Sequence, residues 1–240
     1  MTATITRAAV TAAELDLELE RARALARRRI AWLRARWPAS PGFAGLAIGH
    51  EEADRLTFDD RAEHADAFFE HDPAAASATA DLQTLDAALN QIRLEGRAPL
   101  GALSATLELD AVEHAVLALA VCAELDPAFA RLCAYLADDA TRAQLTPRLV
   151  CDLLAPGAGL LPAPAAALGP HGRLRHWNLV RIEGGGPWAG RALCVDERVL
   201  AIAAGDNCID RRLRSAIEPL PATELPARLD EAAARAADLI

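Results

Sequence analysis

The pattern of apolar and polar positions divides the chain into a helical part and a shorter part with strand character. Apolar residues recur at intervals of three and four from about residue 81 to residue 154, which is typical of helices that bury one face. An alanine- and proline-rich stretch at 155–170 predicts a loop. Strand-forming residues then dominate from residue 174 to residue 183, and a Gly-Gly-Gly-Pro turn separates them from a second such segment at 191–195. We therefore expect a mainly α protein of the α+β class.

Apolar spacing and residues that favour helix starts predict where the helices lie. Earlier helices are expected at 81–96 and 101–107 from the apolar spacing. Three later helices each begin at an N-cap residue. The first has a capping-box glutamate, and the other two have a proline at the first helical position. These pairs are Asp110 with Glu113, Asp126 with Pro127, and Thr146 with Pro147.

Three helices followed by a β-hairpin is the order of a winged helix-turn-helix, and a short helix is expected after it at 196–203. The glycines at 184–186 lie between two strands, and no lysine follows them. They therefore predict a hairpin tip and not a phosphate-binding loop. The expected fold is a helical bundle with a winged helix-turn-helix, whose hairpin is the wing.

The first 37 residues predict one long helix that starts at Thr11 and is stopped by Pro38. They carry eight arginines against four acids. An arginine-rich helix with Trp32 and Trp37 is a candidate for binding RNA or an anionic membrane. The alternative, which we favour, is a solvated helix that docks on a neighbouring helix.

Residues 38–76 resemble a connector with one short helix near 61–70. Nine acids and two arginines lie between residues 50 and 72. His50 to Asp54 (HEEAD) is a near miss to the H-E-x-x-H zinc motif, but no apolar packing fixes the ligands, so we predict no metal site. Three regions are expected: 1–76 as a helix plus acidic connector, 77–205 as the helical and winged-helix domain, and 206–240 as a tail or linker.

Composition removes several classes of function. All 25 basic residues are arginine, so the chain lacks the lysine of a Walker A motif or a Schiff base. The net charge of −9 does not favour a phosphate-binding surface. The longest apolar run, at 115–123, is too short to cross a membrane, and we expect a cytoplasmic protein without cofactors. The five cysteines form no C-x-x-C pair and are expected to be reduced and mostly buried.

The run from Glu124 to Arg142 (ELDPAFARLCAYLADDATR) resembles a signature in the amino-terminal region of certain bacterial AAA+ ATPases. Those proteins carry a variant winged-helix region before the ATPase module and often accompany phage-tail-like contractile injection systems. Further similar pieces occur in the same order, so the resemblance covers roughly residues 80–214. These pieces are Leu153-Leu154, Leu174-Arg175-His176, Arg191-Ala192-Leu193 and Val195 to Val199.

The resemblance implies a regulatory or adaptor region beside a ring-forming motor, with protein partners that include the motor domain and particle components. The Walker motifs of that module are absent from this sequence, so no catalytic residue carries over. The alternative is a winged-helix DNA-binding protein. Contacts to either kind of partner are expected from Arg148, Arg173, Arg175, Trp177, Arg181, Trp188 and Arg191, with core packing as the alternative role of the two tryptophans.

We do not expect an enzyme. The serine motif G-x-S-x-G is absent, and the serines are Ser40, Ser77, Ser104 and Ser215. His114 follows Glu113 on a predicted helix, where a packed or surface histidine is expected and not a general base. His176 is likewise expected to be structural.

Overall fold

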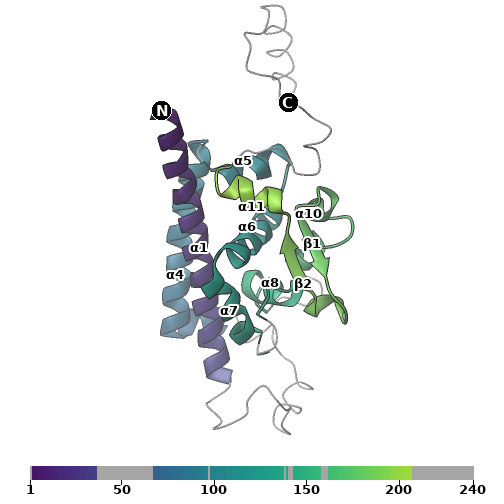
Figure 1. The fold of residues 1–240 in the computed structure, drawn as a ribbon. Helices are drawn as coiled ribbons and strands as arrows, with labels where there is room; N and C mark the ends of the chain where they lie inside the picture. The colour runs from purple at the N-terminus through teal and green to yellow at the C-terminus, as the bar shows by residue number, and fades with distance from the viewer. Residues whose placement is uncertain are drawn as a thin grey trace, which may run out of the picture. The chain divides into compact units, whose positions relative to one another are not determined.

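The structure is a computed structural model of the 240-residue chain, and it describes residues 2–36, 67–96, 98–137, 139, 143–157 and 162–206, with side chains from residue 13 to residue 35 in the first range. The elements are α1 (Thr2–Arg36), α4 (Pro73–Leu94), α5 (Pro99–Thr106), α6 (Ala111–Leu125), α7 (Pro127–Leu136), α8 (Pro147–Leu154), α9 (Ala163–Ala167), α10 (Arg173–His176), β1 (Val180–Glu183), the 3-10 helix η1 (Trp188–Gly190), β2 (Ala192–Val195) and α11 (Glu197–Ala203) (Figure 1).

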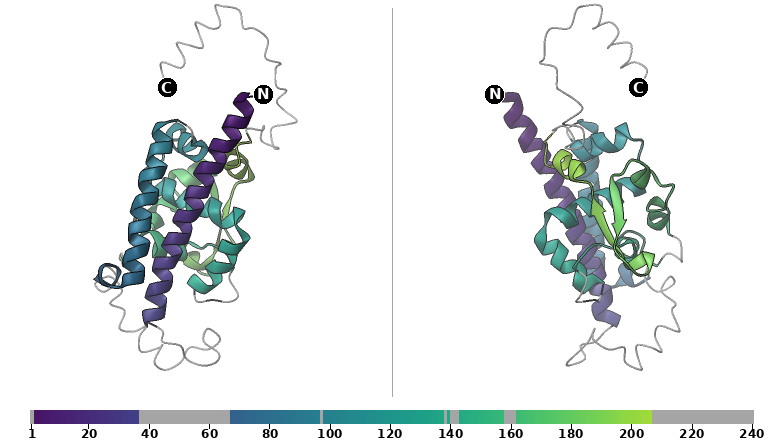
Figure 2. Two further views of the ribbon diagram at one scale, coloured as in Figure 1. Left: turned by 90° about the vertical axis from the view of Figure 1, so that its left-hand side faces the viewer. Right: turned by 45° about the vertical axis from the view of Figure 1, so that its right-hand side comes forward.

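Two long helices, α1 and α4, lie side by side along one flank of the described structure (Figure 1, Figure 2). Ala22, Ala24 and Ala26 of α1 are buried, and side chains of this size let neighbouring helices approach closely. The predicted start of α1 is wrong, because the helix already begins at Thr2 and Thr11 lies inside it. A helical residue such as Thr11 cannot act as the N-cap, which needs non-helical backbone.

The helix α4 also begins earlier than expected. Asp72 is its N-cap and accepts a hydrogen bond from the backbone amide of Ala75 at 2.9 Å, and Pro73 occupies the first helical position. Its end agrees with the prediction, since Gly96 follows with a φ of 65°. The buried face includes Leu82 and Leu89, as the apolar spacing predicts.

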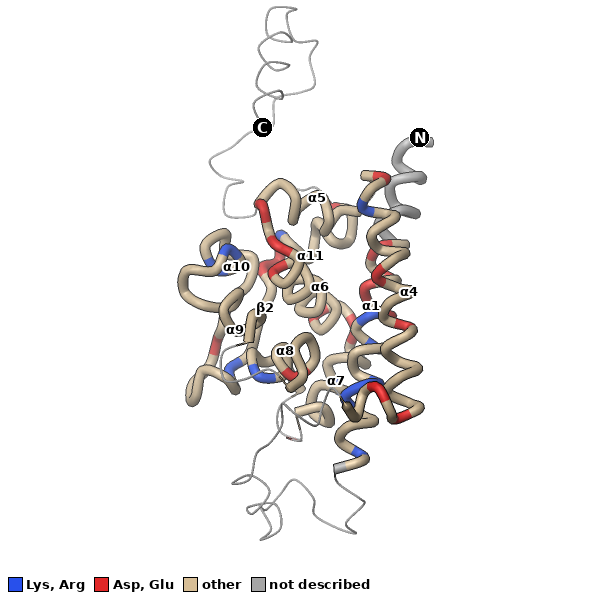
Figure 3. Tube along the Cα trace, turned by 180° about the vertical axis from the view of Figure 1, so that it is seen from behind, with Lys and Arg blue, Asp and Glu red and all other residues tan. Residues whose placement is uncertain are grey.

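Four of the described arginines of α1 form ion pairs, most of them with acids of neighbouring elements, and in the charge-coloured trace the basic positions of α1 lie among acidic positions of α1 and α4 (Figure 3). The pairs are Arg21 with Asp86, Arg23 with Glu20 and Asp126, Arg27 with Asp81, and Arg29 with Asp152. Trp32 packs edge-on against Phe68 at 5.1 Å between ring centroids, and Phe69 is buried beside them. The favoured interpretation, a docked helix, is therefore confirmed for the described part of this segment. Trp37 lies outside it.

The central helix is α6, most of whose residues are buried. The predicted capping box is present: Asp110 accepts from the amide of Glu113 at 2.8 Å, and Glu113 accepts from the amide of Asp110 at 3.0 Å. Asp126 and Thr146 cap α7 and α8 as predicted, each with proline at the first helical position.

The β-hairpin packs on the helices through β2. Strand β1 pairs with β2 in antiparallel register, with Val180 opposite Val195 and Glu183 opposite Ala192. The amide of Leu193 in β2 donates to the carbonyl of Leu145 at 2.8 Å, which ties the hairpin to the segment before α8. The hairpin tip is at the predicted glycine run. The predicted helix after the hairpin is α11, with Asp196 as its N-cap.

Two local predictions between α8 and the hairpin are wrong. The alanine- and proline-rich stretch 155–170, expected to be a loop, contains α9. The first predicted strand begins too early, because its first residues form α10 and only Val180–Glu183 are extended. Asn178 separates the two with a φ of 52°, a left-handed conformation that asparagine tolerates better than most residues.

The described residues form one compact unit that differs from the expected division at 76–77. That position lies inside α4, and the unit spans Met1–Asn207, so α1 belongs with the winged-helix part. A second unit, Cys208–Ile240, lies outside the described residues. Among the described helices, none is both long and apolar enough to cross a membrane.

Candidate functional site

The helix in the position of a recognition helix, α8, is mostly buried. Its only exposed residue is Arg148, while Pro147, Leu149, Val150 and Leu153 are buried. A DNA-reading helix presents several polar side chains from its first turns to the base edges of the major groove. This helix presents one.

The helix α1 covers part of α8. Arg28 of α1 donates to the carbonyl of Leu153 at 3.1 Å, and Arg29 lies 3.0 Å from the carboxylate of Asp152. The same carboxylate is 3.0 Å from Arg148 on α8 itself. The one exposed arginine of α8 is therefore already paired with an acid of its own helix. The same oxygen, Oδ2 of Asp152, also accepts from Arg29 and so links α8 to α1.

The arginines predicted to contact a partner are also mostly engaged within the chain. Arg173 lies 3.2 Å from the carboxylate of Glu113, and Arg191 donates to the carbonyl of Gly186 at 3.0 Å. Arg181 lies 3.1 Å from Glu183 and 3.6 Å from Asp196. Among the described residues, the guanidinium of Arg175 contacts no acid.

The two tryptophans of the hairpin region are exposed, but they do not form one patch. Trp177 is 50% exposed and follows α10, before β1. Trp188 is 38% exposed and belongs to η1, after the hairpin turn. The four-residue strand β1 lies between them and spans roughly 13 Å, so they lie at opposite ends of the hairpin. His176, expected between strand residues, is helical and touches Trp177 edge-on at 5.0 Å between ring centroids.

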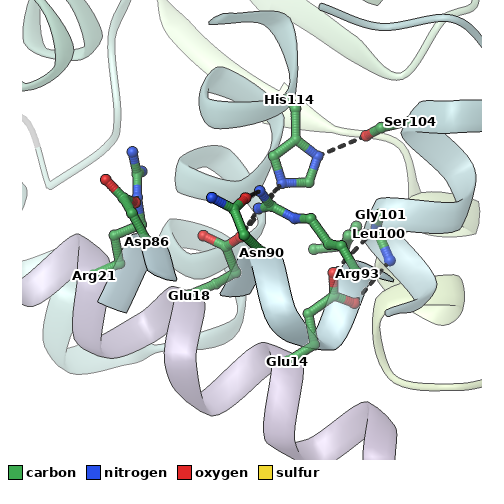
Figure 4. A network of polar contacts seen from close by, with 10 residues as sticks. All are labelled: Glu14, Glu18, Arg21, Asp86, Asn90, Arg93, Leu100, Gly101, Ser104 and His114. Atoms are coloured by element: carbon green, nitrogen blue, oxygen red, sulfur yellow. Dashed lines mark hydrogen bonds and ion pairs between the residues drawn. The ribbon is translucent and has the colours of Figure 1, made fainter. Parts of the chain in front are cut away.

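A largely buried polar network joins α1, α4, α5 and α6 (Figure 4). Glu18 of α1 is 2% exposed and accepts from Arg93 of α4 at 2.8 Å. His114 of α6 lies 3.3 Å from the same carboxylate oxygen and 2.7 Å from the hydroxyl of Ser104 in α5. Single-sequence patterns gave no sign of these contacts, because they join residues far apart in the chain.

Glu14 belongs to the same region and caps α5. Its two carboxylate oxygens accept from the amides of Leu100 at 2.9 Å and Gly101 at 3.0 Å. Burial raises the pKa of Glu14, although both of these hydrogen bonds lower it. Burial also acts to raise the pKa of Glu18, but the hydrogen bond and charge of His114 and the charges of Arg21 and Arg93 outweigh it, and that pKa is lowered.

Ser104, His114 and Glu18 have the residue types of a serine-histidine-acid relay, with Arg93 as a fourth member. Nδ1 of His114 lies 2.7 Å from the hydroxyl of Ser104, and Nε2 lies 3.3 Å from Glu18 and 2.5 Å from Nη2 of Arg93. Ser104 and His114 are buried, so these contacts hold a packed histidine within the network.

A groove of about 670 Å³ runs beside this network. The acids and arginines that line it are already paired, Arg21 with Asp86 and Arg93 with Glu18. Among the described residues no group of three or more histidines, cysteines and acids is placed to hold a metal ion. The near-miss motif at His50 to Asp54 lies outside them.

The described cysteines are free thiols. Cys122 and Cys133 are buried, and burial raises their pKa values to about 12 and about 11. Cys151 and Cys194 are half-buried, and Cys208 lies outside the described residues.

The comparison with known families gives a match over most of the chain. A family model described as "Winged helix domain, variant" matches residues 15–217. Comparisons with curated proteins and with solved structures find no match. The matched range contains α4 to α11 with the hairpin, and most of α1. The chain therefore belongs to the variant winged helix domain family.

Proposed function

We propose that this winged helix domain is a non-catalytic protein-interaction module, an adaptor or regulatory region that acts in the cytoplasm beside an AAA+ motor. The observation that carries the proposal is the burial of α8. Only Arg148 of this helix is exposed, and Asp152 pairs with it. Winged helix domains bind DNA or proteins, and a covered recognition helix favours protein.

The paired arginines and the net charge of the chain also favour a protein partner over DNA. Non-specific DNA binding is supplied by several unpaired cations that displace counterions from the phosphates. Here Arg148, Arg173 and Arg181 each lie within 3.2 Å of a carboxylate of the same chain. The net charge of −9 adds a general repulsion toward DNA.

The absence of catalysis is part of the proposal. The only described serine that lies beside a histidine is Ser104, and this histidine also contacts Arg93 and Glu18. Ser104 is also buried. Its role in this proposal is to complete the hydrogen bonding of a buried histidine, which otherwise costs free energy.

The identity of the motor rests on the resemblance of the Glu124–Arg142 run to AAA+ proteins of contractile injection systems. In the described part, this run forms the end of α6 and all of α7. Ala128, Arg131 and Tyr135 are exposed on α7, so the resembling segment includes accessible side chains. We propose that the clients are components of such a particle.

The test is a pull-down with the full chain as bait from lysate of its own cells, with and without nuclease, read by mass spectrometry. Recovery of an AAA+ motor or of sheath, tube or baseplate-like proteins that survives nuclease supports the proposal. Recovery that disappears after nuclease contradicts it and favours the DNA-binding alternative.

A second measurement addresses DNA directly. We expect the chain to give no salt-sensitive shift of duplex DNA in a gel or anisotropy titration. If it gave one that the double variant Arg148→Ala, Arg175→Ala abolished, these two arginines would be phosphate contacts. The protein-interaction proposal would then be wrong.

A further inference from the structure

We propose that α10 and Trp177 form a docking surface for an acidic segment of a partner protein. This surface consists of Arg173, Arg175, His176 and Trp177, and we call it the α10 surface. The inference rests on the protein-interaction function proposed above and adds the place of binding and the chemistry of the partner.

The segment of the sequence that contains α10 is basic, although the chain as a whole is acidic. No aspartate or glutamate occurs between Asp152 and Glu183, whereas the stretch contains three arginines and two histidines. The net charge of the chain is −9. In the charge-coloured trace, α10 carries basic positions and no acidic one (Figure 3). An acidic segment would be attracted to this surface and repelled by much of the rest of the molecule.

Two side chains of the α10 surface are available for contacts with a partner. Trp177 is 50% exposed although it is large and apolar, and aromatic residues of this kind are frequent anchors of protein interfaces. The guanidinium of Arg175 contacts no acid among the described residues. Arg175 is half-buried, and it lies two residues before exposed Trp177 in the chain.

The α10 surface is held rigidly. Leu174 is fully buried beneath it, and Glu113 accepts hydrogen bonds from both the backbone amide and the guanidinium of Arg173. Gly172 lies so close to the carbonyl of Ala167 that a side chain would not fit there. A preorganised surface loses little conformational entropy on binding.

The neighbouring contacts favour carboxylates over phosphates. Arg173 and Arg181 are already occupied by side-chain carboxylates of this chain. Nucleic acid binding needs several phosphate contacts to reach a useful affinity, and Arg175 is one cation. One arginine, a histidine and an exposed tryptophan fit a short acidic peptide with an apolar side chain.

The experiment titrates the full chain against a fluorescein-labelled oligo-glutamate peptide with a central leucine, followed by anisotropy at low salt. A peptide with glutamine in place of glutamate is the charge control. The variants are Arg175→Glu and Trp177→Ala. The matched variant is Arg131→Glu, which makes the same charge change at an exposed position of α7. We expect about tenfold weaker binding for the first two and less than about twofold for Arg131→Glu.

Three results overturn the inference: no binding of the oligo-glutamate peptide, equal weakening by Arg175→Glu and Arg131→Glu, or tighter binding of duplex DNA that Arg175→Glu abolishes. Circular dichroism of each variant shows whether it is folded. If the nuclease-resistant pull-down succeeds equally with Arg175→Glu and Trp177→Ala, the protein-interaction function stands and only the α10 surface is wrong. If the pull-down itself fails while the peptide binds, the proposed function is wrong.

Discussion

The carboxylate of Glu14 caps a helix that begins 85 residues later in the chain, accepting a hydrogen bond from the amide of Leu100 at 2.9 Å. Unsatisfied amides at a helix start cost free energy when they are buried, and Leu100 is buried. This contact therefore ties α1 to the bundle through a side chain that the helix α5 cannot replace from its own sequence, since Ala98 is at its N-cap position.

We predict that Glu14→Ala lowers the free energy of unfolding by about 2 kcal/mol, because it leaves two buried amides without acceptors. Urea denaturation followed by circular dichroism measures the change. Asp16→Ala is the control, since Asp16 is an exposed acid on the same helix, and it should change stability by less than about 0.5 kcal/mol. Equal effects of the two substitutions would show that Glu14 acts only through the charge of α1.

The contacts of Glu18 with His114, Arg21 and Arg93 make stability depend on pH in acid. The pKa of Glu18 is lowered from its ordinary value of 4.5 in the folded protein, so the folded state binds this proton less readily than the unfolded state. The resulting stability is present above pH 4.5 and is lost as the pH falls through the folded-state pKa.

We therefore predict that Glu18→Gln is less stable than the wild type by about 3 kcal/mol at pH 7, and that this difference shrinks below pH 4.5 because wild-type Glu18 becomes neutral. Urea denaturation of both proteins between pH 7 and about pH 3 measures it. A difference that stays constant across this range would mean that Glu18 acts by its shape and not by its charge.

Gly172 positions the α10 surface. A Cβ atom at this residue would lie 2.2 Å from the carbonyl oxygen of Ala167, whereas one at Gly185 in the hairpin tip would meet nothing within 4 Å. Backbone cannot move aside as a flexible side chain does. We predict that Gly172→Ala destabilises the protein by about 1–3 kcal/mol, while Gly185→Ala changes stability by less than about 0.5 kcal/mol. Thermal denaturation of the two variants compares them, and a neutral Gly172→Ala would show that this turn adjusts freely.

The parts of the fold that sequence predicted are those with short-range causes. The caps at Asp110, Asp126 and Thr146 each join residues two or three positions apart, so the pattern contains the whole interaction. The hairpin tip is equally local. The α+β class was predicted correctly because the helix caps and the hairpin turn occur along the chain in the order of a winged helix-turn-helix.

The wrong predictions concern segments without apolar periodicity and segments whose structure depends on residues far apart in the chain. Alanine- and proline-rich α9 has no apolar periodicity to predict a helix. Strand formers in 174–179 suggested a strand, but Leu174 is buried as part of α10 and Asn178 turns the backbone. The buried network is similar: Glu18 and His114 are 96 residues apart, and nothing in one sequence pairs them.

The depth of α6 and α7 in the core predicts the order in which cysteines react. Burial raises the pKa of Cys122 to about 12, so about one thiol in ten thousand is ionised at pH 8, and the thiolate is the reactive form. We expect iodoacetamide to label half-buried Cys151 and Cys194 in the folded protein before Cys122 and Cys133, and to label all four alike in urea. Peptide mapping by mass spectrometry distinguishes the sites. Labelling of Cys122 in the folded protein as fast as that of Cys194 would contradict the central position of α6, because a helix whose thiols are open to solvent cannot form the core on which the hairpin packs.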